Sequence, residues 1–291
     1  MAKKIIVFSV LILFSVSGLV VFQTSKFNDG KLHLIFCDVG QGDAILIKTP
    51  GGKYILVDGG PDDSVLNCLS KHMPLWDRTL QVVILTHPHA DHLTGLISVV
   101  RRYNLISYDT ENPENQNAGL KILQDILAVK NLSARYLEKG DSFTDQANFK
   151  LETLWPSEEY AKNLAQKTNA EATDPDSNGF CIVQLLYYVN FKALLTCDTD
   201  AATGEKAAFE SGKVNVLQIP HHGSKTGLSP LFLQEAVPDL AVISVGKNNN
   251  YGHPNQATLS LLKNHNIETL RTDEKGDIEI ITDGKSWYLV N

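Results

Sequence analysis

The stretch THPHADHLTG, residues 86–95, places three histidines and one aspartate within six positions, directly after an apolar run that predicts a buried strand. Side chains alternate along an extended chain, so His87 and His89 should point the same way. Asp91 and His92 fall where the chain turns into a predicted helix. Imidazole and carboxylate groups are typical zinc ligands, and catalytic zinc sites leave a position open for water. The stretch therefore predicts a metal site at the end of a strand, with enough ligands for two ions.

Polar side chains also follow other apolar runs, in each case where a predicted strand ends. Loops that leave one edge of a sheet lie close together, so these side chains are expected to converge on the histidine cluster. A single aspartate or histidine of this kind is more often a solvated or capping residue, and only the repeated placement supports a site. The residues are Asp58, Asp198, His221, His222 and His253.

The order of the predicted elements indicates two sheets. Short strand patterns separated by glycine turns occupy residues 31–58, and helix and strand patterns then alternate. The scheme repeats in the second half of the chain, which ends in a predicted hairpin. Two polar stretches, 109–133 and 156–179, are expected to form a helical excursion and a long loop near the site. The pattern predicts two sheets packed face to face with helices outside.

The first residues differ from the rest of the chain in composition. Two lysines precede an uncharged apolar run from Ile5 to Phe22, which reaches the lower limit of length for crossing a bilayer. We interpret residues 1–24 as a membrane anchor rather than a cleaved signal peptide, because no clear small-residue cleavage motif is present. The lysines should stay in the cytoplasm, leaving a linker at 25–30 and a domain at 31–291 outside. If the segment is cleaved, the domain is secreted instead.

The composition of the chain is that of a globular enzyme, with 43% hydrophobic and 20% charged residues. The formal net charge of −7 excludes a protein that coats nucleic acid through bulk electrostatics. It does not exclude a nuclease, because an enzyme can hold a phosphodiester locally through metal ions.

The four cysteines have no metal-binding spacing. Three lie in or at the end of apolar strand patterns and one lies in a predicted helix. An exported chain could pair them as disulfides, but their placement favours buried free thiols. They are Cys37, Cys68, Cys181 and Cys197.

Taken together, these motifs resemble those of the metallo-β-lactamase superfamily. THPHADH matches its HxHxDH motif, Asp58 and Asp198 match two of its aspartates, and HHGS at 221–224 matches its last histidine motif. Further stretches closely resemble the extracytoplasmic domain of the ComEC competence proteins and the phosphorylcholine esterases of teichoic acid. These stretches are DVGQGDAILI (38–47), ILVDGG (55–60), LLTCD (194–198), IPHHGS (219–224) and NYGHP (250–254). The resemblance covers roughly residues 31–290 and implies a four-layer αββα sandwich.

The resemblance also implies a role for each residue of the cluster. A first metal ion would be held by His87 and His89, and a second by Asp91, His92 and His222. Asp91 would be the catalytic residue, which orients the attacking water or accepts its proton. The remaining roles are Asp198 as the bridging ligand, His221, Ser224 and His253 as contacts to the substrate phosphate, and Asp58, Asp38 and Asp43 as groups that orient the ligands. Residues 38–43, DVGQGD, are equally well explained as a turn formed by Gly40 and Gly42, in which Asp38 and Asp43 have no role at the site.

Two positions depart from the superfamily pattern. No histidine lies between His92 and Asp198, where the third ligand of the first ion is expected. The matching segment, TDPDSNGF, offers Asp176 and Asn178 as oxygen substitutes. Cys197 stands where the family usually has glycine, beside the bridging aspartate. The first metal site is therefore expected to be the weaker of the two.

The resemblance implies a hydrolase that acts outside the cytoplasm with one or two Zn²⁺ ions, or with Mn²⁺, through a metal-bound hydroxide. The expected activity is that of a phosphodiesterase or nuclease with DNA as substrate. A phosphorylcholine esterase of teichoic acid is the alternative, and a lactamase is less well supported because the nearest motifs belong to another branch. A non-catalytic binding module of a DNA-uptake system is the alternative from a different class, and the missing histidine is its main support.

Overall fold

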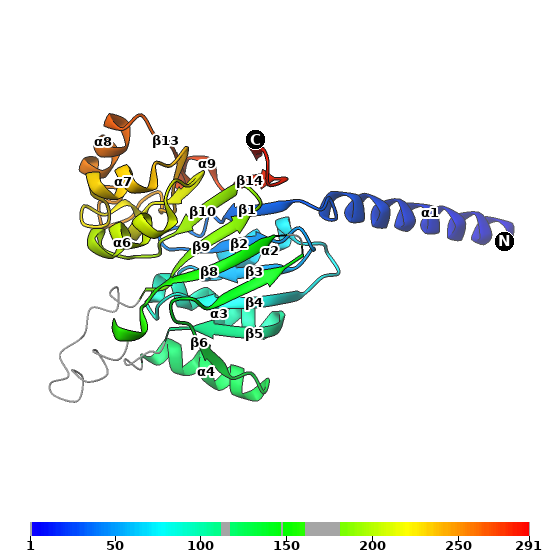
Figure 1. Cartoon of the computed structure of the whole chain (residues 1–291). Coiled ribbons are helices and arrows are strands. Elements are labelled where there is room, and N and C mark those ends of the chain that lie inside the picture. The colour runs from blue at the N-terminus through cyan, green and yellow to red at the C-terminus, as the bar shows by residue number, and fades with distance from the viewer. Residues whose placement is uncertain (1, 112–116, 147, 161–180, 291) are drawn as a thin grey trace.

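Two β-sheets form the centre of the computed structural model, which describes residues 2–111, 117–146, 148–160 and 181–290 (Figure 1). The first sheet has the order β15-β14-β1-β2-β3-β4-β5-β6, and the second has the order β13-β12-β11-β10-β9-β8-β7. The strands of the first sheet are β1 (Leu32–Phe36), β2 (Ile45–Lys48), β3 (Tyr54–Val57), β4 (Thr79–Leu85), β5 (Asn104–Thr110), β6 (Ala134–Tyr136), β14 (Ile278–Thr282) and β15 (Trp287–Val290). Those of the second are β7 (Ser142–Asp145), β8 (Phe149–Trp155), β9 (Val183–Tyr188), β10 (Phe191–Leu195), β11 (Val216–Gln218), β12 (Leu240–Ile243) and β13 (Glu268–Arg271).

Helices cover the outer face of each sheet, and apolar side chains fill the three interfaces between the layers. One core cluster, which includes Leu96, joins the first sheet to its helices, and another, which includes Phe232, does the same for the second sheet. A third cluster around Phe36 lies between the sheets. The helices are α2 (Ser64–His72), α3 (Ala90–Arg102) and α4 (Ala118–Val129) on the first sheet, and α6 (Ala201–Ser211), α7 (Pro230–Ala236) and α8 (Gln256–Asn264) on the second. The predicted four-layer αββα sandwich is confirmed.

The N-terminal helix joins the domain at one edge of the sheets, and the predicted site residues lie at the opposite edge. β1 is antiparallel to β2, β2 is antiparallel to β3, and β3 is parallel to β4, so β1, β3 and β4 all begin at one edge. The N-terminal helix α1 (Ala2–Phe27) joins the domain there, and we call it the α1 edge. The carboxyl ends of β3, β4, β10, β11 and β12 lie at the opposite edge, where the predicted site residues follow them. We call this the site edge.

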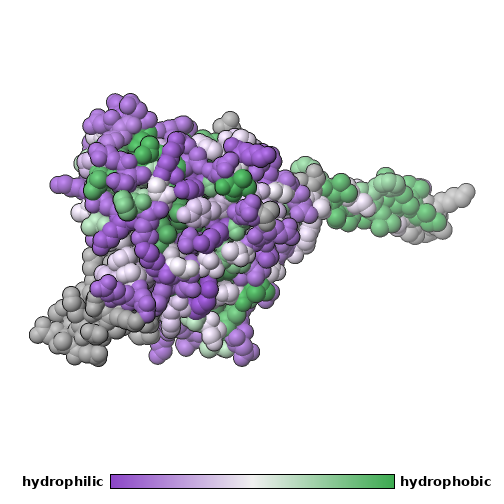
Figure 2. All heavy atoms as spheres, in the orientation of Figure 1, coloured by the Kyte–Doolittle hydropathy of each residue, from purple (hydrophilic) through white to green (hydrophobic). Residues whose placement is uncertain are grey.

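Helix α1 projects away from the domain (Figure 1) and is an apolar rod beside a body with a largely hydrophilic surface (Figure 2). Its segment Ile6–Thr24 is long and apolar enough to cross a membrane, and none of that window is buried against the rest of the chain. The helix continues to Phe27, which lies within the linker predicted at 25–30. Only residues 28–31 separate α1 from β1.

The sequence patterns placed most elements correctly but missed part of the first sheet. β5 and β6 pair in parallel at its edge, and neither strand was predicted. The expected helical excursion within 109–133 is α4, while most of the expected loop at 156–179 lies outside the described residues. Helix α3 begins at Ala90, so Asp91 and His92 occupy its first turn instead of preceding it.

The four cysteines form two disulfides, and the expectation of free thiols is wrong. Cys37 pairs with Cys68, and Cys181 pairs with Cys197, with Cα–Cα distances of 5.8 and 6.1 Å. All four side chains are buried, as expected. Burial alone does not distinguish a thiol from a disulfide, because the pairing depends on which strands and helices become neighbours. Disulfides and the apolar N-terminal helix together point to a location outside the cytoplasm.

Candidate metal centre

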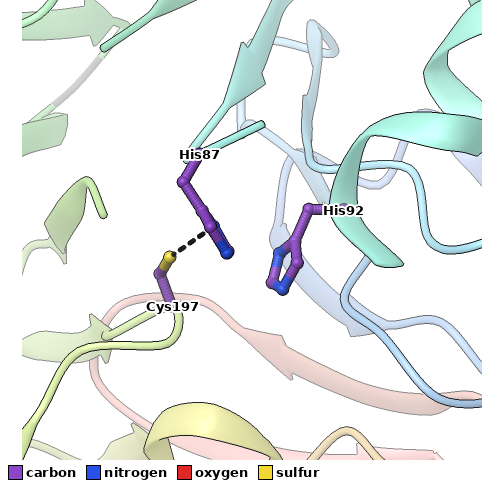
Figure 3. A group of neighbouring side chains, drawn as sticks. All are labelled: His87, His92 and Cys197. Atoms are coloured by element: carbon purple, nitrogen blue, oxygen red, sulfur yellow. Dashed lines mark hydrogen bonds between the residues drawn. The ribbon is translucent and has the colours of Figure 1, made fainter. Parts of the chain in front are cut away.

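The turn between β4 and α3 brings three histidine rings together at the site edge. The ring centroid of His87 lies 4.5 Å from that of His89 and 4.1 Å from that of His92. Asp91 lies in the first turn of α3, where a carboxylate interacts favourably with the helix dipole. Figure 3 shows the rings of His87 and His92 side by side, with Cys197 approaching from the other sheet. The cluster therefore lies where the two sheets meet.

Four of the predicted ligands form one compact group. Ligand atoms of Asp91, His92, Asp198 and His222 all lie within 4.8 Å of one another. The Nε2 atom of His222 is 3.3 Å from Asp91 Oδ2 and 3.6 Å from Asp198 Oδ2. His92 Nε2 lies 3.4 Å from Asp198 Oδ2. These four residues are the set that the resemblance assigns to the second ion, and we call them the tight group.

The other ring nitrogen of each histidine in the tight group has a partner of its own. His92 Nδ1 lies 2.8 Å from Asp58 Oδ2, and His222 Nδ1 lies 3.1 Å from the carbonyl oxygen of Ser244. Asp58 also accepts hydrogen bonds from the backbone N–H and the hydroxyl of Thr86. A histidine that donates Nδ1–H presents an unprotonated Nε2 to a metal ion. Asp58 thus lies where the predicted orienting group should lie.

The loop that precedes β2 carries Asp43 into the same region. Asp43 is buried and accepts a hydrogen bond of 2.8 Å from Gln218 Nε2. A Cβ on Gly42 would lie 2.1 Å from the carbonyl oxygen of Asp91, so only glycine allows this loop to pack against the start of α3. Asp38 is exposed, and its carboxylate accepts from the N–H of Gly40. Asp38 therefore stabilises a turn, and it is not part of the buried cluster.

Burial and opposite charges together set the protonation of the tight group. Burial by itself would raise the pKa of Asp198, but the neighbouring imidazoles of His222 and His92 hold it well below its usual range. Burial would lower the pKa of His222, yet the carboxylates of Asp198 and Asp43 raise it to about 9. The pKa of His92 is likewise raised, chiefly by Asp198 and Asp58 in opposition to burial. In the metal-free protein, protons therefore occupy the positions that a cation would take.

Several ligand atoms at the centre are buried without a hydrogen-bond partner. Among the described residues they include His87 Nε2, His92 Nε2, Asp198 Oδ1 and Asp43 Oδ1. Each such atom costs about 1–3 kcal/mol when it is left unpaired. Imidazole nitrogens and carboxylate oxygens that converge in this way suit a divalent cation such as zinc. The residues present therefore fit a metal ion.

Four residues around the centre have left-handed backbone conformations. The φ angles are 59° at Asp58, 53° at Cys197, 52° at His221 and 53° at His222. Each residue lies within four positions of the end of a strand. Residues other than glycine pay about 1–2 kcal/mol for this conformation, and such strain is concentrated at functional sites. The conformation also explains why glycine suits the position of Cys197 in the family.

His87 is surrounded differently from the histidines of the tight group. Its Nδ1 atom lies 3.4 Å from the sulfur of Cys197 (Figure 3). It also lies 3.5 Å from the sulfur of Cys181. The backbone N–H of Asp198 donates a hydrogen bond to Cys181 Sγ at 3.0 Å. The disulfide thus contacts both His87 and the backbone of Asp198. Burial and the neighbouring His92 lower the pKa of His87 well below its usual value.

The predicted first metal site is incomplete in the described part of the chain. His89 belongs to none of the groups of three or more ligand atoms within 4.8 Å that the described residues form. His87 groups with His92 and Cys197, but Cys197 is committed to a disulfide. Asp176 and Asn178 lie outside the described residues.

The predicted substrate contacts lie on one side of the tight group. His221 is partly exposed, and its Nε2 lies 3.8 Å from Asp198 Oδ2. The His253 ring is 5.7 Å from that of His221, and its backbone is held by the side chain of Asn249. Burial lowers the pKa of His253, with smaller contributions from the two neighbouring histidines. Ser224 is buried, and its hydroxyl lies 3.3 Å from that of Thr226.

Sequence patterns missed one residue that shapes the centre. Gln218 lies in the apolar run of β11, and its side chain is buried. Its Nε2 donates to Asp43, and its Oε1 accepts from the backbone N–H of Thr196 and of Cys197. It therefore links the two sheets at the site. A polar residue within an otherwise buried strand was the signal that could have found it.

Comparisons with known proteins agree with this geometry. A family described as the Metallo-beta-lactamase superfamily matches residues 37–108. ComE operon protein 3 of Bacillus subtilis (strain 168) is 26% identical over 284 residues, which cover 87% of this chain and 33% of that protein. Competence protein ComA of Neisseria gonorrhoeae is 27% identical over 270 residues, which cover 90% of this chain and 34% of that protein. Residues 37–108 and the fold of the domain are therefore similar to those of the metallo-beta-lactamase superfamily.

The chain is distantly homologous to these competence proteins and spans about a third of their length. The metallo-beta-lactamase fold protein YhfI from Bacillus subtilis has a similar structure, with a TM-score of 0.57 and 12% identity. That similarity covers 87% of this chain and 100% of YhfI. At this level of identity the structural match concerns the fold alone.

Proposed function

We propose that this chain is a metal-dependent phosphodiesterase or nuclease that acts outside the cytoplasm. The observation that carries the proposal is the tight group, in which a carboxylate and an imidazole from each sheet converge and all but Asp91 are buried. A module that binds no metal has no need to leave His92 Nε2 and Asp198 Oδ1 buried and unpaired, at a cost of about 1–3 kcal/mol each.

Zinc is the proposed cofactor, with the tight group as its principal site. A second ion would bind at His87 and His89 with lower affinity. When bound, the ions would lower the pKa of a water molecule towards neutrality and stabilise negative charge on the leaving oxygen.

The side chains of the chain itself divide the remaining work. Asp91 is 31% exposed, whereas Asp198 and His222 are each 2% exposed. It is therefore the carboxylate of the tight group that solvent can reach, and the one placed to orient a water molecule or accept its proton. Asp58 keeps His92 oriented, and His221 and His253 lie where a phosphate oxygen could accept their hydrogen bonds.

We propose DNA as the substrate because the curated relatives carry names from competence. The acidic net charge does not conflict with this substrate, because binding would rest on local contacts at the metal centre. We further propose that α1 is retained as a membrane anchor and that the domain lies on the outer side. A phosphorylcholine esterase of teichoic acid is the alternative substrate class.

The test uses the full chain in detergent, loaded with Zn²⁺ or Mn²⁺, with two substrates side by side. Labelled single-stranded DNA should be cleaved, and p-nitrophenyl phosphorylcholine should not. Asp91→Asn should lower the rate by about 100-fold to 10,000-fold, as expected for loss of a positioned proton acceptor. Asp38→Asn is the matched control, because this surface aspartate should not affect the rate.

Two outcomes would contradict the proposal. Cleavage of the choline ester alone would assign the esterase function. Zinc bound at the tight group without cleavage of either substrate would favour the non-catalytic module.

A further inference from the structure

The α1 edge carries an exposed apolar turn on the loop that leads into β4. Leu75 is 60% exposed and Trp76 is 54% exposed, and neither belongs to the core clusters of the described residues. The turn is closed by a hydrogen bond of 3.0 Å from the Asp77 N–H to the Pro74 carbonyl oxygen. We call residues 74–77 the apolar turn. An exposed indole next to an exposed leucine is costly in water, which suggests that another surface covers them.

The residues on either side of the apolar turn hold it in place. Met73 is buried in the core between the first sheet and its helices. Arg78 stacks over the ring of Tyr103 and donates a hydrogen bond of 2.9 Å to its hydroxyl. Leu75 and Trp76 are therefore presented by a fixed turn rather than by a free loop.

The apolar turn lies on the same side of the domain as α1. His33 on β1 pairs with Lys48 on β2, and Lys48 pairs with Tyr54 at the start of β3. These three residues therefore mark the α1 edge of the first sheet. β4 runs parallel to β3 and begins at Thr79, so the loop before β4 projects beyond this edge. Figure 1 shows the connection into β4 on the side from which α1 projects.

The chain between α1 and β1 holds this edge close to the end of the apolar helix. Four residues follow Phe27 before Leu32, and they can extend over at most about 14 Å. The link is also fixed to the sheet, because Asp29 forms an ion pair with Lys48 at 2.6 Å and its Oδ2 lies 2.9 Å from His33 Nε2. If α1 spans the bilayer, the α1 edge lies within about 20 Å of the hydrocarbon boundary.

Further exposed side chains of the same kind lie along this edge. Val189, at the turn between β9 and β10, is 46% exposed, and Tyr288 on β15 is 48% exposed. The Nζ atom of Lys31 lies 3.4 Å from the Tyr288 hydroxyl. Tryptophan, tyrosine and lysine are typical of the interface between lipid and water. The first sheet thus presents interfacial side chains towards the side of α1, and the second sheet adds the exposed apolar Val189.

We infer that the apolar turn inserts into the interfacial layer of the lipid bilayer that α1 spans, as a second membrane contact of the domain. Leu75 and Trp76 would lie among the lipid headgroups and the first acyl carbons. The site edge would then face away from the membrane, because β4 alone separates the two edges by about 23 Å. Substrate would reach the metal centre from the aqueous phase.

The inference is tested with the full chain in phosphatidylcholine nanodiscs whose acyl chains carry bromine near the headgroup. A variant with Trp155→Phe and Trp287→Phe leaves Trp76 as the single tryptophan. Its emission should be quenched at least about twofold relative to discs without bromine, as expected for an indole at the interface. The matched variant with Trp76→Phe and Trp287→Phe leaves Trp155, which lies at the site edge and should not be quenched.

Protection of α1 from protease reports separately whether the helix has inserted. Protected α1 with unquenched Trp76 would overturn the inference and leave the proposed anchoring intact, and unprotected α1 would overturn both. Self-association of the chain in detergent that Leu75→Ser with Trp76→Ser abolishes would assign the turn to a second copy of the chain instead. The same double variant should leave zinc binding unchanged, since both residues are at the opposite edge from the centre.

Discussion

The two halves of the metal centre share one short turn but differ in how their ligands are supported. In the tight group, His92 and His222 each have a hydrogen-bond partner behind the ring, and two carboxylates face them across the gap between the sheets. On the other side, His87 is backed by the sulfur atoms of a disulfide, and His89 is not part of a comparable group among the described residues. Both halves offer imidazole nitrogens, but only the tight group combines them with two carboxylates and with a hydrogen-bond partner behind each ring.

The largest expected effect comes from removing a ligand in each half. Zinc titration of the parent protein should show one tight and one weak equivalent. His92→Ala should weaken the tight equivalent by more than about 100-fold, because loss of a ligand costs more than loss of a supporting contact. His87→Ala should remove the weak equivalent and spare the tight one. Two equally tight ions in the parent, or loss of both in His87→Ala, would show that other residues complete the first site.

A smaller effect is expected when only the support behind His92 changes. Asp58→Asn keeps the shape of the side chain, and asparagine tolerates the left-handed backbone at this position. When the N–H₂ group of the introduced amide faces His92 Nδ1, it cannot accept the hydrogen bond that the Asp58 carboxylate accepts. The His92 ring is then less well oriented. Affinity at the tight equivalent should fall about 10-fold to 100-fold. Asp38→Asn is the control, and an equal loss there would refute the assignment of Asp58.

The disulfide beside His87 should affect stability more than metal binding. Replacing Cys181 with Ser and Cys197 with Gly opens a loop with a sequence separation of 16, worth about 3 kcal/mol of unfolding free energy. Glycine relieves the left-handed backbone at Cys197 and should return about 1 kcal/mol. Denaturant unfolding should show this net loss of about 2 kcal/mol.

The variant with serine at both cysteine positions is the matched comparison. It keeps a side chain on the left-handed backbone at position 197 and should be less stable than the glycine variant by about 1 kcal/mol. Equal stability of the two variants would show that the backbone at position 197 relaxes. The tight zinc equivalent should persist in both.

The last expected effect is a dependence of stability on pH in the metal-free protein. The pKa of His222 is raised to about 9, so the folded state binds a proton that the unfolded chain releases near its usual pKa of about 6.5. This stabilisation is fully present below about pH 6.5 and is lost as the pH rises through about 9. The slope should not exceed about 1.4 kcal/mol per pH unit for this one proton.

Unfolding in urea with a chelator at several pH values would measure that slope. His222→Gln should reduce it without removing it, since the pKa of His92 is raised in the same direction. A parent protein whose stability rises from pH 7 to 9 without metal would contradict the charge assignment. Zinc affinity should change in the opposite sense and increase over this range, because binding displaces protons.

The sequence alone determined the layered fold and most ligands of the tight group. Strand and helix patterns repeat at the right spacing, and the HxHxDH stretch concentrates four candidate ligands at one strand end. Both signals are local, since they depend on alternation, helical periodicity and turn residues within a few positions. Asp198 and His222 were also predictable, because each follows an apolar run and matches a motif of the metallo-β-lactamase superfamily.

Tertiary structure decided which of these side chains share a site and what supports them. The side chain of Asp38 stays at a surface turn while that of Asp43 is buried, although both belong to one glycine-rich string. Gln218 became part of the centre because β11 lies beside β10 in the second sheet. The cysteine pairs, expected as thiols, depended on contacts between segments 31 and 16 positions apart. Disulfides and the hydrogen bonds that support a ligand join residues that are distant in sequence. Such residues become neighbours only when the sheets pack, so no local sequence pattern predicts them.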